Sequence, residues 1–287
     1  MSNTTHGTLL MIAAIFAFSI MDAFANALST RMHTMQVVWA RYNFQVAASL
    51  IVLAPHLTTL MKTRYIGAQL LRSCFLFAAT MTFFFSFAKL SLPEATAIFQ
   101  LAPIFITLGA FLFLGERFGI WRWLGVIAGF IGVLIIIRPG LEGYNWYSTL
   151  PILAGIFYAS YTLSTRALGR DESPWTSFLY TALIGVVVST AIVPFYWTSP
   201  DLTGWLLMIF LGVFGGIGHY LLIKSLSLAE ASILAPWTYA SMVFSIMWGA
   251  VVFGEYIDPL TALGATIIIA AGLFIWWREN RAERLSH

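Results

Sequence analysis

Charged side chains are what this sequence has least of. Asp, Glu, Lys and Arg make up 9% of its 287 residues, whereas hydrophobic residues make up 60%. A soluble domain carries about 25% charged residues, so this composition excludes an ordinary soluble fold. The sequence holds a single cysteine, Cys74, which excludes an internal disulfide and a cysteine-based metal centre.

The motifs of several enzyme classes are also missing. The sequence has no His-Glu-x-x-His pair, no Gly-x-x-x-x-Gly-Lys phosphate loop and no pair of carboxylates deep in predicted helices that would serve as acid and base. We therefore expect no catalytic residue, no bound metal, no cofactor and no ATP-driven pump. A basic stripe on a soluble surface, which nucleic-acid binding needs, is not expected either.

Long apolar runs dominate what is present. Each is about 20 residues long and apolar on all sides, which predicts membrane-spanning helices rather than the alternating strands of a barrel. The fold class predicted is an all-α membrane protein with ten transmembrane helices and very short connections. The predicted spans are 7–28, 36–55, 66–90, 93–114, 119–137, 147–167, 174–197, 203–226, 229–253 and 259–277.

The distribution of Lys and Arg predicts the orientation of these spans. Short basic loops stay on the cytoplasmic side. With the amino terminus inside, ten basic residues fall on the cytoplasmic side and three on the other, so both termini are predicted to be cytoplasmic. The ten are Lys62, Arg64, Arg117, Arg122, Arg166, Arg170, Lys224, Arg278, Arg281 and Arg284, and the three are Arg31, Lys89 and Arg138.

The second half of the chain echoes the first. Ala-Ala-Ile-Phe at 13–16 returns as Ala-Gly-Ile-Phe at 154–157, and three further pairs of short segments follow in the same order. We predict two repeats of five helices, 1–142 and 143–287. Because five is odd, the second repeat is inverted, an architecture typical of secondary transporters. One chain then contains a complete transport unit, so a monomer is sufficient for transport.

Short motifs in both repeats resemble the EamA family of the drug/metabolite transporter superfamily. A Glu-Ala pair near Glu94 and Glu230 begins one helix of each half, and a Gly-Glu pair at Glu116 and Glu255 ends it. This resemblance covers nearly the whole chain. It implies a carrier of small metabolites, often an exporter of amino acids, with substrate held between helices one to four and six to nine and with helices five and ten peripheral.

Ionisable residues inside the spans are the most direct candidates for a binding site, because such groups persist in a membrane only when paired, hydrated or useful. By helical rise, Asp22 and Arg41 lie about 8 Å below the same membrane surface. We expect them to pair across the first hairpin, with Asn26 on the face of Asp22. This pair would either fix the two helices together or take part in binding or gating.

Prolines and aromatic residues complete the candidate site. Pro103 and Pro236 interrupt matching helices of the two repeats, where each frees backbone carbonyls near a possible cavity or simply kinks the helix. His219 is either a polar packing residue or a substrate or proton contact. The remaining predicted substrate contacts are Phe83, Phe99, Gln100, Tyr158, Tyr161, Trp237 and Tyr239.

The sequence thus predicts an alternating-access carrier of small metabolites in a bacterial inner membrane, in contact with lipid. Amino acids are the first expected substrate class, moved by an exporter or facilitator. A nucleoside-like, cofactor-like or amine-like substrate moved by proton coupling is the alternative. A channel or a non-transporting structural membrane protein is the alternative of a different class.

Overall fold

The computed structural model describes residues 3–53, 62–114, 120–138, 145–168, 172–229 and 234–285, all helix or short connection. The first repeat contains α1 (Asn3–Ser29), α2 (Thr34–Leu53), α4 (Ile66–Ser86), α5 (Leu92–Phe99), α6 (Ala102–Leu114) and α7 (Ile120–Ile137). The second contains η2 (Trp146–Ser148), α8 (Thr149–Leu168), α9 (Pro174–Thr181), α10 (Leu183–Ile192), η3 (Val193–Tyr196), α11 (Leu202–Leu228), η4 (Ala235–Tyr239), α13 (Ala240–Trp248), η5 (Gly249–Phe253) and α14 (Pro259–Leu285).

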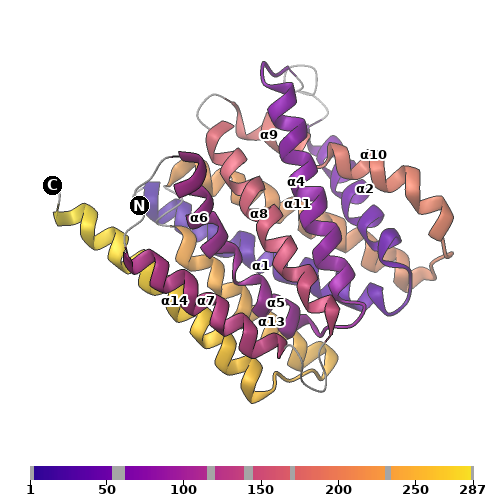
Figure 1. Ribbon diagram of the computed structural model, residues 1–287. Coiled ribbons are helices and arrows are strands. Elements are labelled where there is room, and N and C mark those ends of the chain that lie inside the picture. Colours follow the sequence, from indigo (N-terminus) through magenta and orange to yellow (C-terminus); the bar gives the residue numbers. More distant parts are fainter. Residues whose placement is uncertain are drawn as a thin grey trace.

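Within the described residues these elements combine into ten spans, as the apolar runs predict. Large apolar side chains cover the outside of the bundle, for example Ile127, which is 52% exposed, and Val251, which is 76% exposed. Apolar exposure on this scale indicates a surface that faces lipid. Both termini lie at one end of the bundle (Figure 1), and which side of the membrane that end faces stays a prediction.

Three of the ten spans are broken within the described residues: the fourth, the seventh and the ninth, in which η4, α13 and η5 follow one another. The break in the fourth span differs in position from the prediction. The fourth span stops at Phe99 and restarts at Ala102, just before Pro103 rather than at it. A proline lacks an N–H and its ring clashes with the carbonyl four residues earlier, here that of Phe99, so the first helix ends at that residue. The seventh span breaks at Ala182, which the sequence did not reveal.

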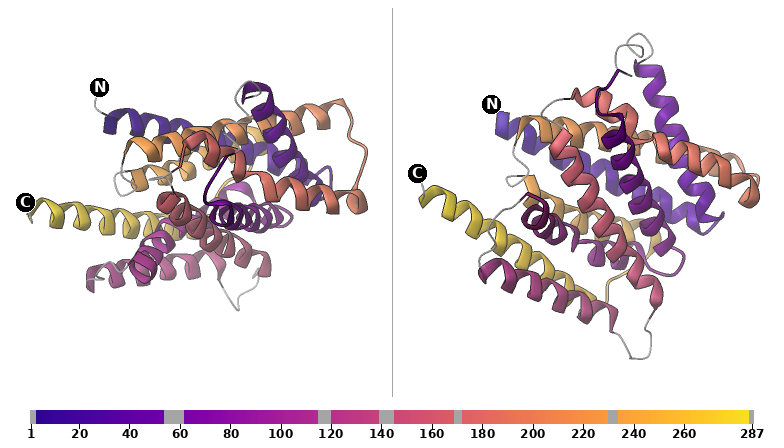
Figure 2. Two further views of the ribbon diagram at one scale, coloured as in Figure 1. Left: turned by 90° about the horizontal axis from the view of Figure 1, so that it is seen from above. Right: turned by 45° about the horizontal axis from the view of Figure 1, so that its top comes forward.

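Most contacts between long helices join the two repeats. α1 packs along α11, α2 along α11 and α10, and α4 along α8. α7 and α14 pack on each other at one edge of the bundle, as Figure 1 and both views of Figure 2 show. They touch where Gly132 and Gly264 each face the backbone carbonyl of the other. No described side chain of these two helices lines the central cavity.

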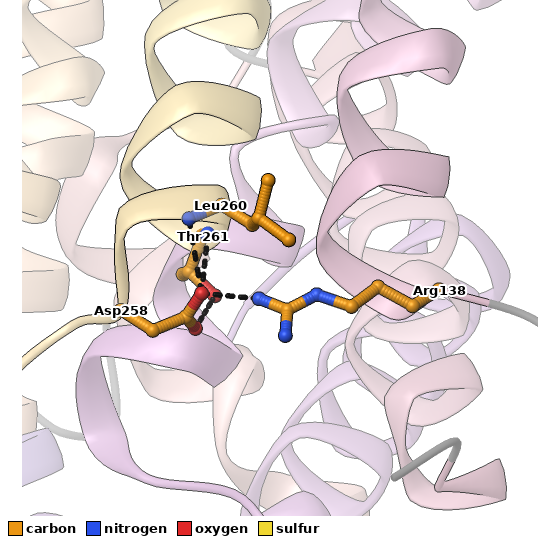
Figure 3. Close-up of polar contacts among 4 residues, drawn as sticks. All are labelled: Arg138, Asp258, Leu260 and Thr261. Atoms are coloured by element: carbon orange, nitrogen blue, oxygen red, sulfur yellow. Dashed lines mark hydrogen bonds and ion pairs between the residues drawn. The ribbon is translucent and has the colours of Figure 1, made fainter. Parts of the chain in front are cut away.

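An ion pair joins the ends of α7 and α14 away from the termini (Figure 3). The Arg138 guanidinium donates to the Asp258 carboxylate, which also accepts from the backbone N–H groups of Leu260 and Thr261 and from the Thr261 hydroxyl. Partial burial opposes ionisation of Asp258, but these hydrogen bonds outweigh it and lower the pKa of its carboxyl to about 2. Asp258 therefore stays ionised and holds the first turn of α14 against α7.

Candidate substrate cavity

A cavity of about 140 Å³ lies between the two repeats. Its walls come from seven of the ten spans, the first four together with the sixth, eighth and ninth. Its aromatic lining residues are Phe18, Phe83, Phe84, Phe99 and Tyr158, its hydroxyl-bearing ones are Ser19, Thr80, Thr96, Thr238, Ser241 and Ser245, and its charged ones are Asp22 and Arg41.

Arg41 is almost fully buried in the cavity wall and contacts α11 of the opposite repeat. Its Nη2 donates to Nε2 of His219 at 2.8 Å, and since a guanidinium only donates, the imidazole accepts at Nε2 and carries its proton on Nδ1. Arg41 also lies with its guanidinium carbon 4.5 Å from the centre of the Tyr42 ring. Its Nε and Nη1 have no hydrogen-bond partner among the described residues.

The predicted ion pair between Asp22 and Arg41 is not formed, so that expectation is wrong. Both residues line the cavity, but no ion pair within 4 Å joins them, and Asp22 Oδ1 is buried without a partner among the described residues. The reason is that Arg41 turns toward His219 on α11 instead of across its own hairpin. The carboxyl group of Asp22 and the guanidinium of Arg41, each with unused hydrogen-bonding capacity, therefore face one hollow.

Gln100 links the broken fourth span to the ninth span. Its Nε2 donates to the carbonyl of Tyr239 at 3.3 Å, and its Oε1 accepts from the Ser241 hydroxyl at 3.3 Å. Ser19 on the first span accepts from Nε1 of Trp248 at 3.0 Å, a second link to the ninth span. The helix breaks of the two repeats are thus tied to each other at the wall of the cavity.

The structure brings together most of the predicted site residues and leaves out four. Those that line the cavity are Asp22, Arg41, Phe83, Phe99, Gln100, Tyr158, His219 and the helix-breaking Pro103. Asn26 is buried away from it, Tyr161 lies one helical turn beyond Tyr158, and Tyr239 contributes its carbonyl to Gln100.

Trp237 departs furthest from the prediction, because its side chain is 42% exposed and does not line the cavity. It belongs to η4, a tight 3₁₀ segment within the ninth span, and this geometry turns the ring outward. Pro236 lies in the same turn. Glu116 and Glu230, one member of each of the two repeated motifs, fall outside the described residues.

Sequence reasoning missed a second buried cation, Arg72 on α4. It is fully buried and donates from Nη2 to the Ser177 carbonyl and, at 2.9 Å, to the Thr181 hydroxyl of α9. The signal was available, since an arginine six residues into an apolar span is as costly as Arg41. The partners of Arg72 could not be predicted from the sequence, because Ser177 and Thr181 lie more than 100 positions further along the chain.

The profile of the EamA-like transporter family matches this sequence twice, over residues 5–138 and 145–277. The chain belongs to that family. This EamA protein is therefore a transporter and not an enzyme, and it is a multi-pass integral protein of the bacterial inner membrane.

Curated relatives cover nearly all of this EamA protein. A riboflavin transporter of Vibrio cholerae is 30% identical over 97% of this chain and 95% of its own, and an S-adenosylmethionine uptake transporter of Rickettsia bellii is 31% identical over 94% and 93%. A pseudopaline exporter of Pseudomonas aeruginosa is 26% identical over 92% and 94%. A solved crystal structure with 17% identity has a TM-score of 0.71 over 97% of this chain and 99% of that one, which supports the fold. Small metabolites are thus the cargo class.

Proposed function

We propose that this transporter carries a zwitterionic metabolite that has an aromatic or heteroaromatic part. The observation that supports this most directly is the placement of Asp22 and Arg41 on the wall of one aromatic cavity without an ion pair between them. A substrate with an ammonium and a carboxylate group would complement both charges, which are otherwise costly in a bundle surrounded by lipid.

The remaining walls fit the rest of such a molecule. Phe18, Phe83, Phe99 and Tyr158 line the hollow with aromatic faces, which suit stacking on a planar ring. Phe83 and Phe99 lie with their ring centres 5.0 Å apart, and Phe99 and Tyr158 with theirs 5.5 Å apart, so these side chains form one continuous aromatic wall.

Two kinds of substrate meet this description. S-adenosylmethionine, named for relatives of this chain, has an amino-acid group and an adenine ring, and an aromatic amino acid has the same two features in a smaller molecule. A neutral heterocycle such as riboflavin, named for another relative, does not meet the description and is the competing candidate, because it would use the aromatic wall and the hydroxyl groups without needing either charge.

Counterflow in proteoliposomes tests the proposal. Vesicles loaded with unlabelled S-adenosylmethionine, phenylalanine or riboflavin receive the same labelled compound outside, with and without a pH gradient. We expect saturable exchange of at least one of the two zwitterions, and the direction of net flux follows from the gradient experiment. Exchange of riboflavin alone would refute the zwitterion proposal in favour of the neutral heterocycle, and an unsaturated flux would indicate a channel.

Substitution of the two charges sharpens the test. Asp22→Asn and Arg41→Gln keep the size of each side chain and remove its charge. Loss of a charge-assisted hydrogen bond costs about tenfold or more in affinity, so each variant should raise the KM for a zwitterion and leave that for riboflavin, if it is carried, unchanged. Thr96→Val, on the same cavity wall, is the matched control and should leave the KM within about threefold of the wild type.

A further inference from the structure

Arg72 forms no ion pair within 4 Å with any side chain among the described residues. It is fully buried, and its Nη2 is used by the Ser177 carbonyl and the Thr181 hydroxyl. Its Nε and Nη1 have no partner among the described residues. Glu172, an acidic residue of the connection before α9, accepts hydrogen bonds from the Thr63 hydroxyl at 2.9 Å and from Gln69 Nε2 at 3.4 Å.

Burial of a guanidinium without an ion-pair partner is energetically costly. Removing an ion from water costs several kcal/mol even after relaxation, and two neutral acceptors return only part of that. A neutral side chain of similar length at position 72 would pack against α9 without this cost. The guanidinium therefore points to an anionic partner that is present during part of the working cycle.

A line of unused polar groups connects Arg72 to the cavity. The guanidinium carbon of Arg72 lies 5.7 Å from the centre of the Tyr161 ring, and that ring lies 6.0 Å from the ring of His219, which lines the cavity. The Tyr161 hydroxyl and His219 Nδ1 are both buried without a hydrogen-bond partner among the described residues. Leu76 and Tyr158, one helical turn from Arg72 and Tyr161 respectively, line the cavity.

The two buried arginines lie at different depths of the bundle. Arg41 is seven residues from the start of α2 and Arg72 six residues from the start of α4, and these starts are at opposite ends of the bundle because consecutive spans run in opposite directions. At 1.5 Å per residue each arginine is about 10 Å from its own end, so in a hydrocarbon layer of about 30 Å they lie on opposite sides of the midplane.

We infer that Arg72, together with Tyr161 and His219, forms a second anion position that receives the carboxylate of the substrate after it leaves Arg41. This inference rests on the proposed zwitterionic substrate. In it, His219 is shared between the two positions: its Nε2 accepts from Arg41, and its Nδ1–H is free to donate toward the side of Tyr161. The second position lies toward the end of the bundle that carries both termini.

Turnover and binding separate this role from that of Arg41. With the zwitterion that the wild type exchanges, S-adenosylmethionine or phenylalanine, Arg72→Met should lower the maximal exchange rate about tenfold or more while the substrate affinity of the cavity stays within about threefold. Tyr161→Phe removes one hydroxyl that bonds to no described residue, so it costs the fold nothing and should still slow exchange severalfold.

Thr181→Val is the matched control for a purely structural role, because it removes a hydrogen bond of Arg72 and leaves its charge in place. It should exchange substrate at close to the wild-type rate. The inference is overturned if Tyr161→Phe exchanges at the wild-type rate, or if Thr181→Val is slowed as much as Arg72→Met. Should Arg72→Met not fold, Tyr161→Phe alone decides. A wild type that exchanges no zwitterion would instead refute the proposed function.

Discussion

The contact between α2 and α11 at Gly212 sets the distance between Arg41 and His219, and one added methyl group tests this. A Cβ at position 212 would lie 2.3 Å from Cβ of Phe44 and 2.8 Å from the backbone nitrogen of Gln45. Neither atom belongs to the flexible end of a side chain. Gly212→Ala therefore cannot be accommodated by a rotamer change, and the two helices must separate.

The required separation follows from the contact distances. Ordinary van der Waals contact of a Cβ begins at 3.4 Å, so the helices must move apart by about 1 Å at this point. His219 lies two turns further along α11, where the same movement would stretch its 2.8 Å bond to Arg41 beyond hydrogen-bond range. Overpacking of this kind lowers the free energy of unfolding by about 1–3 kcal/mol. The lost hydrogen bond to the buried Arg41 lowers it by about as much again.

Gly216→Ala is the matched control on the same helix, one turn later. There the added Cβ meets only Cγ of Gln45, at 3.4 Å, so we expect wild-type stability and transport. Unfolding in mixed micelles and counterflow in proteoliposomes measure both properties. If Gly212→Ala is as stable as Gly216→Ala and transports as fast, the close approach of α2 and α11 does not hold the site.

Three further predictions concern single side chains. His219→Leu removes the acceptor of Arg41 and should weaken substrate affinity about tenfold. His219→Gln keeps an acceptor and should retain most of the affinity. If the pH dependence of transport is unchanged in His219→Gln, this residue is not a proton carrier. Gln100→Leu removes both bonds to the ninth span and should cost about 1–2 kcal/mol of stability, seen as an earlier unfolding midpoint than in Ser245→Ala. Asp258→Asn should lower stability by less than about 1 kcal/mol at pH 7, because the site is half exposed. The folded pKa of Asp258 lies below its ordinary value of 3.8, so this stabilisation is present above pH 4 and the difference from wild type should vanish as the pH falls from about 4 to about 2; a difference that persists at pH 2 would assign it to packing.

The ten spans were predictable because lipid imposes one requirement on every segment that crosses it: about 20 apolar residues with all backbone groups bonded internally. The second span illustrates this, since the sequence predicts 36–55 and the helix runs over Thr34–Leu53. The cavity was predictable in outline for a related reason. Polar side chains such as Asp22, Arg41 and Gln100 cannot face lipid, so they gather between helices.

Which polar groups meet was not predictable, because pairing between distant helices depends on how the repeats pack. Arg41 follows Asp22 by one hairpin, yet it bonds to His219, which lies 178 positions away. The outward turn of Trp237 has a similar origin. A continuous α-helix through Pro236 would place this ring on a different face from the one that the 3₁₀ turn gives it.

The two arginines that are buried among the described residues, Arg41 and Arg72, belong to the first repeat, and the groups that hold them, His219 for one and Ser177 with Thr181 for the other, belong to the second. The two EamA repeats therefore have different roles: the first supplies the cations and the second supplies the acceptors that orient them. Two copies of the first repeat assembled alone would lack these acceptors, so the arrangement of these two buried charges needs both unlike halves.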